Sequence, residues 1–350
     1  MRAVVYEAVG AAPSVMDVPD PACPDDGVVL DVAATGVCRS DWHAWRGHEV
    51  VALPHIPGHE LAGTVREVGP AVSRWRVGQR VTVPFVLGCG TCDLCRAGDA
   101  QVCPDQEQPG FTMPGSFAEQ VALPRADANL VGLPDNLSFV AAAALGCRFA
   151  TAYRAVVTHG AVRTGQWVAV HGCGGVGLSA VMIAKALGAR VVAVDVSAPA
   201  LGAARELGAD AVVEARVGVD VAAPVREVTG GGPHVSLDAL GAAEVAAASI
   251  RGLRPRGRHV QVGLLHGDDA SAAAPMDIVV AREIAVLGSH GMPAADYPAM
   301  LELVASGALD ASRLVTRRIG LARAGAALTE MDGPTPPGIT IVEPSAIMDR

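Results

Sequence analysis

The chain has 350 residues, more than one ordinary domain needs, and 51% of them are apolar, so two domains with sizeable cores are expected. Its net charge of −9 and its dispersed basic residues argue against a nucleic-acid partner. The sequence has no uninterrupted run of 18 apolar residues and no signal-peptide pattern, so we expect no membrane span and a reducing, cytoplasmic location.

Residues 1–150 contain short β-type runs separated by glycine and proline. Their spacing, near ten residues with turn signals between them, predicts a small antiparallel, barrel-like domain. The runs lie at residues 2–8, 27–38, 61–69, 79–86 and 116–123.

Four cysteines near the end of this region have the spacing C-x2-C-x2-C-x7-C: Cys89, Cys92, Cys95 and Cys103. Thiolates at this spacing can reach one tetrahedral ion at about 2.3 Å, and four thiolates leave no open position. Disulfides are the alternative, but nothing at the N-terminus indicates secretion. We therefore predict a structural zinc site. Cys38, His59 and Cys147 are further metal-type residues outside it.

From Trp167 the pattern changes to strands alternating with helices, which predicts βαβ units and a parallel sheet. Strands are expected at 166–171, 190–197, 210–215, 234–241, 257–265 and 283–291, and helices at 178–188 and 200–209. A helix at 297–307 and a β-type run at 338–344 follow. We assign residues 1–150 to the first domain, 151–289 to a Rossmann domain, and 290–350 to a return to the first domain.

A glycine-rich turn, G-x-G-x-x-G, connects the first of these strands to its helix through Gly172, Gly174, Gly175, Val176 and Gly177. In this context the motif lets the backbone approach a dinucleotide pyrophosphate. Asp195 ends the second strand, where a carboxylate accepts hydrogen bonds from ribose hydroxyls and repels the 2′-phosphate of NADP. The motif therefore predicts NAD, although Asp195 could also be a loop or cap carboxylate.

Together, the glycine turn, the cysteine cluster and three further segments resemble the zinc-dependent medium-chain alcohol dehydrogenases over essentially the whole chain. These segments are GVCRSDWH (36–43), GHE (58–60) and LGCRFAT (145–151). The resemblance implies an α/β protein, with a GroES-like β-rich catalytic domain beside a doubly wound Rossmann domain for the cofactor.

The resemblance also implies roles at individual positions. Cys38, His59 and Cys147 would hold a catalytic zinc with one open position, which lowers the pKa of a bound alcohol. Ser40 and His43 would relay the alcohol proton, Asp41 would orient His59, and Glu60 would lie behind the metal. Arg39 would contact the cofactor pyrophosphate, and Phe85 and Trp42 would line the substrate pocket.

The expected function is reversible oxidation of primary or secondary alcohols larger than ethanol, with NAD and two zinc ions in a homotetramer or homodimer. A polyol or threonine dehydrogenase of the same superfamily is one alternative, and a non-catalytic NAD-binding protein is another. Ala200 and Ile339 stand where many relatives have a lysine and an arginine, so the expectation covers NAD use and not tight NAD binding.

Overall fold

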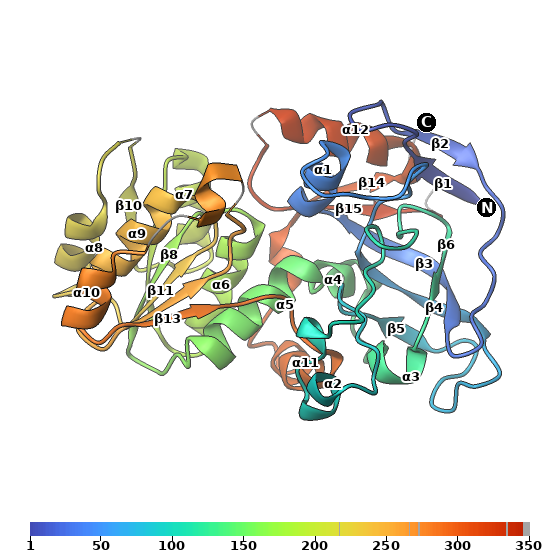
Figure 1. Ribbon diagram of the computed structural model, residues 1–350, viewed down its shortest axis with the longest axis horizontal. Helices are drawn as coiled ribbons and strands as arrows, with labels where there is room; N and C mark the ends of the chain where they lie inside the picture. The colour runs from blue at the N-terminus through green and yellow to red at the C-terminus, as the bar shows by residue number, and fades with distance from the viewer. Residues whose placement is uncertain (217, 266, 272–273, 334, 346–350) are drawn as a thin grey trace. The chain divides into compact units, whose positions relative to one another are not determined.

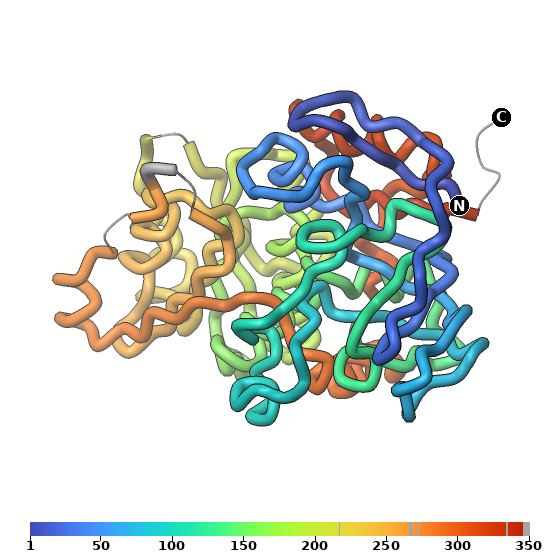
Figure 2. Tube along the Cα trace, turned by 45° about the vertical axis from the view of Figure 1, so that its right-hand side comes forward, coloured from blue at the N-terminus to red at the C-terminus, as the bar shows by residue number. Residues whose placement is uncertain are grey.

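The computed structural model describes residues 1–216, 218–265, 267–271, 274–333 and 335–345, and they divide into two compact units. Unit 1 contains Met1–Ala150 and most of the chain from Gly291 onward; unit 2 contains Thr151–His290 and Pro336–Gly338. Figure 2 traces the early residues of the chain, in blue, and the red C-terminal stretch within the same unit.

Unit 1 is built on a sheet in the order β14-β15-β3-β4-β5-β7, with β6 also paired to β3 (Figure 1). Its pairs are antiparallel except β14 with β15. The strands of this sheet are β3 (Val28–Val37), β4 (Glu60–Val68), β5 (Arg80–Thr82), β6 (Gln120–Leu123), β7 (Val131–Gly132), β14 (Val315–Gly320) and β15 (Ile339–Glu343). A separate hairpin joins β1 (Arg2–Val5) and β2 (Ser14–Asp17).

The core of unit 1 lies over the middle of this sheet. Alternate residues of β3, Val28, Leu30 and Val32, pack with Leu61 and Val81 from the neighbouring strands. The expected run at 79–86 forms a strand only at Arg80–Thr82, and Pro84, which has no backbone N–H for a ladder, follows closely.

Helices of unit 1 connect and flank these strands. They are α1 (Arg39–Trp45), α2 (Asp93–Ala97), α3 (Ala126–Asn129), α4 (Phe139–Ala144), α11 (Tyr297–Ala305) and α12 (Ala324–Thr329). Helix α5 (Cys147–Arg154) begins in unit 1 and continues into unit 2, where a π-helical turn (Ala155–His159) follows.

Unit 2 is a six-stranded parallel sheet in the order β10-β9-β8-β11-β12-β13. The strands are β8 (Trp167–His171), β9 (Arg190–Asp195), β10 (Ala211–Glu214), β11 (Val235–Asp238), β12 (Arg258–Gln261) and β13 (Ala285–Gly288). The helices are α6 (Gly175–Ala186), α7 (Ala198–Glu206), α8 (Ala222–Thr229), α9 (Ala243–Gly252) and α10 (Met276–Ala281).

The chain adds β9 and β10 on one side of β8 and then returns to add β11, β12 and β13 on the other side. Right-handed crossovers therefore place α6 and α7 on one face of the sheet, and α9 and α10 on the opposite face. The fold class predicted from the sequence is therefore confirmed, since a β-rich unit accompanies a doubly wound parallel sheet. No helix among the described residues is both long and apolar enough to cross a membrane.

Candidate active site

Three segments distant in sequence bring four metal-type side chains together in unit 1. Cys38 follows β3, His59 and Glu60 lie at the start of β4, and Cys147 begins α5. One ligand atom from each residue lies within 4.8 Å of the others. Cys38, His59 and Glu60 are buried, whereas Cys147 is partly exposed. The Cys147 thiol and the Arg148 guanidinium hold the pKa of Cys38 well below its ordinary value, although burial alone would raise it.

Asp41 organises the first half of this cluster. One of its oxygens lies 2.9 Å from His59 Nδ1 and accepts the Gly58 N–H at 3.0 Å, and the other accepts the Cys38 N–H at 3.0 Å. Because a carboxylate can only accept, the neutral His59 ring carries its proton on Nδ1 and has its lone pair on Nε2. Nε2 is buried and has no hydrogen-bond partner among the described residues. An orphaned imidazole lone pair beside two thiols fits a metal ion.

Glu60 is held by an ion pair that no sequence pattern indicated. Arg148, the residue after Cys147, donates from its backbone N–H and from Nε to Glu60 Oε1, each at 3.0 Å, and from Nη2 to Oε2. Both side chains are buried. Burial raises the pKa of Glu60, and Arg148 opposes that shift.

Two glycines make room for the Glu60 side chain. A Cβ at Gly36 would lie 2.2 Å from Glu60 Oε2, and a Cβ at Gly146 would lie 2.8 Å from Glu60 Cβ. The glycines of the GVC and LGC segments therefore leave space for the Glu60–Arg148 pair.

The residues assigned to the proton relay lie on α1. Ser40 Oγ is 3.8 Å from Cys38 Sγ. His43 Nδ1 is 2.9 Å from Nδ1 of His48, an exposed histidine for which the sequence indicated no role. Arg39 donates to the Met331 carbonyl at 2.6 Å, and its guanidinium stacks on the Trp42 ring. Within unit 1, the Arg39 side chain is therefore held by Trp42 and Met331.

Aromatic rings surround His59 within unit 1. Phe85 lies 6.1 Å from the His59 ring, between centroids, and Phe111, which was not predicted, lies 5.1 Å from it. Trp42 donates from Nε1 to Asp332 at 2.8 Å and packs beside Tyr6, Trp45 and Leu328.

Tyr297, at the start of α11, was also missed. Its hydroxyl is buried, and it has no hydrogen-bond partner among the described residues. Burial raises the pKa of Tyr297, as do the charges of Cys147 and Glu60. Only its place in a helical run was visible from the sequence.

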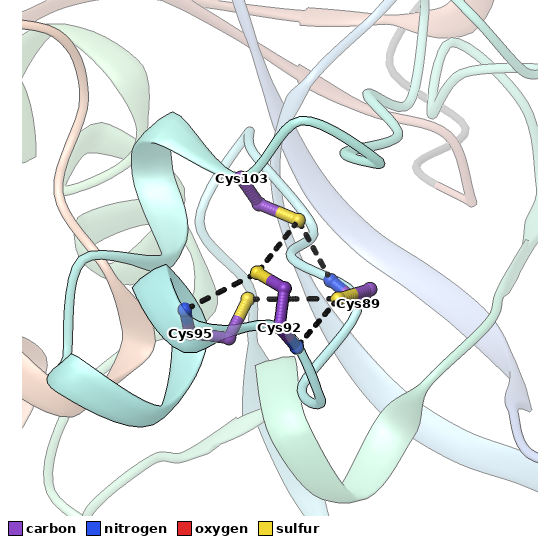
Figure 3. A group of neighbouring side chains, drawn as sticks. All are labelled: Cys89, Cys92, Cys95 and Cys103. Carbon is purple, nitrogen blue, oxygen red and sulfur yellow. Dashed lines mark hydrogen bonds between the residues drawn. The ribbon is translucent and has the colours of Figure 1, made fainter.

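The four-cysteine cluster is compact, and its sulfur atoms converge (Figure 3). Sγ of Cys89 is 3.9 Å from Sγ of Cys95, and Sγ of Cys92 is 3.8 Å from Sγ of Cys103. A disulfide needs about 2.05 Å. Ligands about 2.3 Å from one tetrahedral ion lie about 3.8 Å apart. The distances therefore fit a metal and exclude disulfides within this cluster.

Backbone N–H groups of the same loop point at these sulfurs. Those of Thr91 and Cys92 donate to Cys89 Sγ at 3.5 and 3.3 Å. The contacts from Thr91 are the main cause that lowers the pKa of Cys89 to about 6. The loop therefore favours a thiolate at Cys89, whereas burial raises the pKa of Cys95 to about 12.

In unit 2 the glycine turn has the geometry that its motif predicts. A Cβ on Gly177 would lie 1.8 Å from the Gly172 carbonyl oxygen, so no other residue fits there. Gly172 has a φ of 88°, in the left-handed region. Gly174 precedes α6, and a Cβ there would meet open space, which leaves the N-terminus of α6 accessible to an anion.

Asp195 serves the fold and also lines a pocket beside the glycine turn. Its two oxygens accept the Cys173 N–H at 2.6 Å and the Ser197 N–H at 2.8 Å. It faces a pocket of about 430 Å³ with Gly172 and Val196. Arg216, just beyond β10, lines the same pocket and forms no ion pair with a described residue. No sequence pattern indicated Arg216. The parallel pairing of β9 and β10 places Glu214 beside Asp195, and Arg216 follows two residues after Glu214.

Comparison with known proteins identifies the family. The model of the alcohol dehydrogenase GroES-like domain matches residues 24–135, and that of the zinc-binding dehydrogenases matches residues 175–306. The chain therefore belongs to the zinc-dependent medium-chain alcohol dehydrogenase family, as the sequence indicated.

Three relatives show the breadth of this family. The chain is 37% identical to an alcohol dehydrogenase of Geobacillus stearothermophilus, over 88% of this chain and 90% of the relative. It is 33% identical to a D-arabitol-phosphate dehydrogenase of Enterococcus avium, over 87% of each chain. Its structure is similar to a zinc-binding dehydrogenase of Sinorhizobium meliloti 1021 bound to NADP, with a TM-score of 0.87, 31% identity, and coverage of 98% and 99%. An oxidoreductase that uses zinc and a nicotinamide cofactor follows from these similarities.

Proposed function

We propose that the chain interconverts primary or secondary alcohols and the corresponding aldehydes or ketones, with NAD as hydride carrier and one catalytic and one structural zinc. The observation that carries this proposal is the lone pair of His59 Nε2, which is fixed by Asp41 and left without a partner beside Cys38 and Cys147 among the described residues. A zinc ion bound there would lower the pKa of an alcohol and polarise a carbonyl.

The residues around this cluster would then bind the substrate and move its proton. Ser40 Oγ, 3.8 Å from Cys38 Sγ, would accept the alcohol proton and pass it toward His43. His43 is hydrogen-bonded to the exposed His48, which offers a route to water. Phe85 and Phe111 would give the substrate an apolar wall, which favours alcohols larger than ethanol.

NAD is favoured over NADP because the Asp195 carboxylate faces the pocket beside the glycine turn. Arg216 lines the same pocket, and its positive charge would attract the 2′-phosphate of NADP once the Asp195 carboxylate is removed. Asp195→Gly should raise kcat/KM with NADP at least tenfold, and adding Arg216→Gln should remove most of that gain. A preference of the unmodified enzyme for NADP would refute this interpretation of Asp195.

A panel of alcohols read by NADH absorbance tests the activity directly, with zinc content measured on the same sample. We expect turnover of medium-sized primary and secondary alcohols and two zinc ions per chain. No turnover of any panel member, with one zinc per chain, would favour a non-catalytic protein.

The arabitol-phosphate relative supports a second candidate, a polyol or polyol-phosphate dehydrogenase. Including D-arabitol and its phosphate in the panel distinguishes the two. Assembly into a homodimer or homotetramer is part of the proposal, as is a cytoplasmic location, which suits eight cysteines that are all unpaired.

A further inference from the structure

A second pocket of unit 2 lies at the opposite edge of the parallel sheet from the glycine turn. Gln166 and His234 precede β8 and β11, and Arg258 begins β12, so the pocket lies at the amino ends of these strands. Gly172 and Asp195 lie at the carboxyl ends. The pocket has a volume of about 330 Å³ and shares no lining residue with the pocket beside Asp195.

The lining of this pocket is strongly basic. Arg163, Arg254, Arg256 and Arg258 line it together with His234, and no lining residue carries a carboxylate. We call this site the basic pocket. It gathers four of the 27 lysines and arginines in a chain whose net charge is −9, and three of them, Arg254, Arg256 and Arg258, lie within five residues of the sequence.

The charges of these arginines are poorly neutralised. Arg254 donates from Nε to the Gly232 carbonyl at 2.8 Å, and Arg258 donates to the His159 carbonyl at 3.2 Å. A neutral carbonyl orients a guanidinium but does not neutralise its positive charge. Arg163 forms no ion pair with a described residue.

The one acidic partner found among the described residues is peripheral. Arg256 lies 3.9 Å from Glu283, and both side chains are mostly exposed, at 84% and 78%. Such a pair contributes little at physiological salt.

His234 gives an independent sign of a missing acceptor. The Trp167 backbone N–H donates to His234 Nδ1 at 3.0 Å, so a neutral ring must carry its proton on Nε2. Burial lowers the pKa of His234, and Arg254 lowers it further, which favours the neutral ring. Yet Nε2 lies 2.7 Å from Arg254 Nη1, which can also only donate. The single lone pair of a neutral imidazole cannot accept from both Trp167 and Arg254, and an oxyanion that accepts from Arg254 and from the ring N–H would satisfy the groups left over.

The backbone holds this arrangement in an unusual conformation. Ala161 and Arg256, both lining the pocket, have φ values of 46° and 60°, in the left-handed region that residues other than glycine rarely adopt.

We propose that the basic pocket binds a small, multiply charged oxyanion of the phosphate class, through Arg163, Arg254, Arg258 and the Nε2–H of His234. Guanidinium groups match such oxygens with paired, charge-assisted hydrogen bonds. This site is separate from the cofactor and zinc sites and does not depend on the proposed reaction.

Isothermal titration of the zinc-loaded chain with inorganic phosphate, and separately with diphosphate, tests this site at an ionic strength held constant with NaCl. We expect saturable binding of at least one of these anions, and a loss of affinity of about tenfold or more in Arg163→Gln/Arg258→Gln, because each charge-assisted hydrogen bond contributes strongly. Arg163→Glu is a second variant that should also lower the affinity, and it removes no hydrogen bond between the Arg163 side chain and a described residue.

Two control variants separate binding in this pocket from binding elsewhere on the protein. Arg205→Gln changes an exposed arginine on α7 and should leave anion affinity unchanged. Arg216→Gln removes the charge beside Asp195 and should also leave it unchanged if the anion binds at the amino-terminal edge of the sheet. Absence of saturable binding, an undiminished affinity in both pocket variants, or an equal loss in either control would overturn the proposal.

Discussion

The two cysteine-containing clusters of unit 1 are built in different ways. Cys89, Cys92, Cys95 and Cys103 come from one loop of fifteen residues, and the N–H groups that contact their sulfurs come from the same loop. Cys38, His59 and Cys147 come from three separate elements, and Asp41 and the Glu60–Arg148 pair surround them. Four thiolates saturate an ion, whereas two thiolates and an imidazole leave one position free. The comparison supports the proposal that the first cluster stabilises a loop and that the second does chemistry.

Serine substitutions in the two clusters should have opposite results. Cys147→Ser should abolish turnover, with a loss well beyond the roughly 10- to 100-fold typical of losing a residue behind a metal ligand, and should leave one zinc per chain. Cys92→Ser should also leave one zinc but keep turnover and lower Tm.

Metal analysis, kinetics and thermal unfolding on the same preparations check this contrast. Cys23→Ser, outside both clusters, is the matched control and should retain two zinc ions. Turnover in Cys147→Ser with one zinc per chain would contradict the assignment of Cys147 as a ligand of the catalytic zinc.

Ser40→Ala should lower kcat by about 10² to 10⁴, the usual contribution of a positioned proton acceptor. Both zinc ions should stay bound, because Ser40 is not among the clustered ligand residues. Ser40→Thr keeps the hydroxyl and should stay active. Full activity in Ser40→Ala would show that the proton leaves by another route.

Breaking the ion pair behind the second cluster should cost stability. Arg148→Met leaves the Glu60 carboxylate buried and unpaired, and loss of one partner of a buried pair typically lowers the free energy of unfolding by about 3–5 kcal/mol. Glu60→Gln/Arg148→Met removes both charges and should lose less, as denaturant unfolding of the zinc-loaded proteins can show. A double variant that is less stable than the single one would contradict this role of the ion pair.

His43→Gln should have the smallest effect, and one that depends on pH. The variant lacks the base that passes the proton toward His48, so alcohol oxidation should slow at neutral pH. At high pH hydroxide can accept the proton, and the loss should shrink. A pH series of kcat measures this, and an equal loss at every pH would mean that His43 only packs.

The sequence predicted those features that depend on neighbouring residues. Apolar runs located the six strands of the parallel sheet and five of the seven strands of the unit 1 sheet, but not β7 or β14, and spacing located the cysteine cluster and the glycine turn. Contacts between distant segments were missed, because Arg148 and Glu60 are 88 positions apart and nothing local to either residue indicates the other. Phe111 and Tyr297 were missed for the same reason. Arg216 could have been found from the parallel pairing of β9 and β10, which aligns Glu214 with Asp195.

The difference in sequence separation also orders the assembly of the chain. The contact between Cys89 and Cys103 closes a loop of 14 positions, and that between Glu60 and Arg148 spans 88. Closing the longer loop costs only about 1.6 kcal/mol more in chain entropy, but it also requires β4 and α5 to dock first. With the two zinc ions proposed above, a growing or partly folded chain would capture its first ion early and its second only when the β-rich unit is complete. Binding of the second ion would therefore report that the β-rich unit has folded.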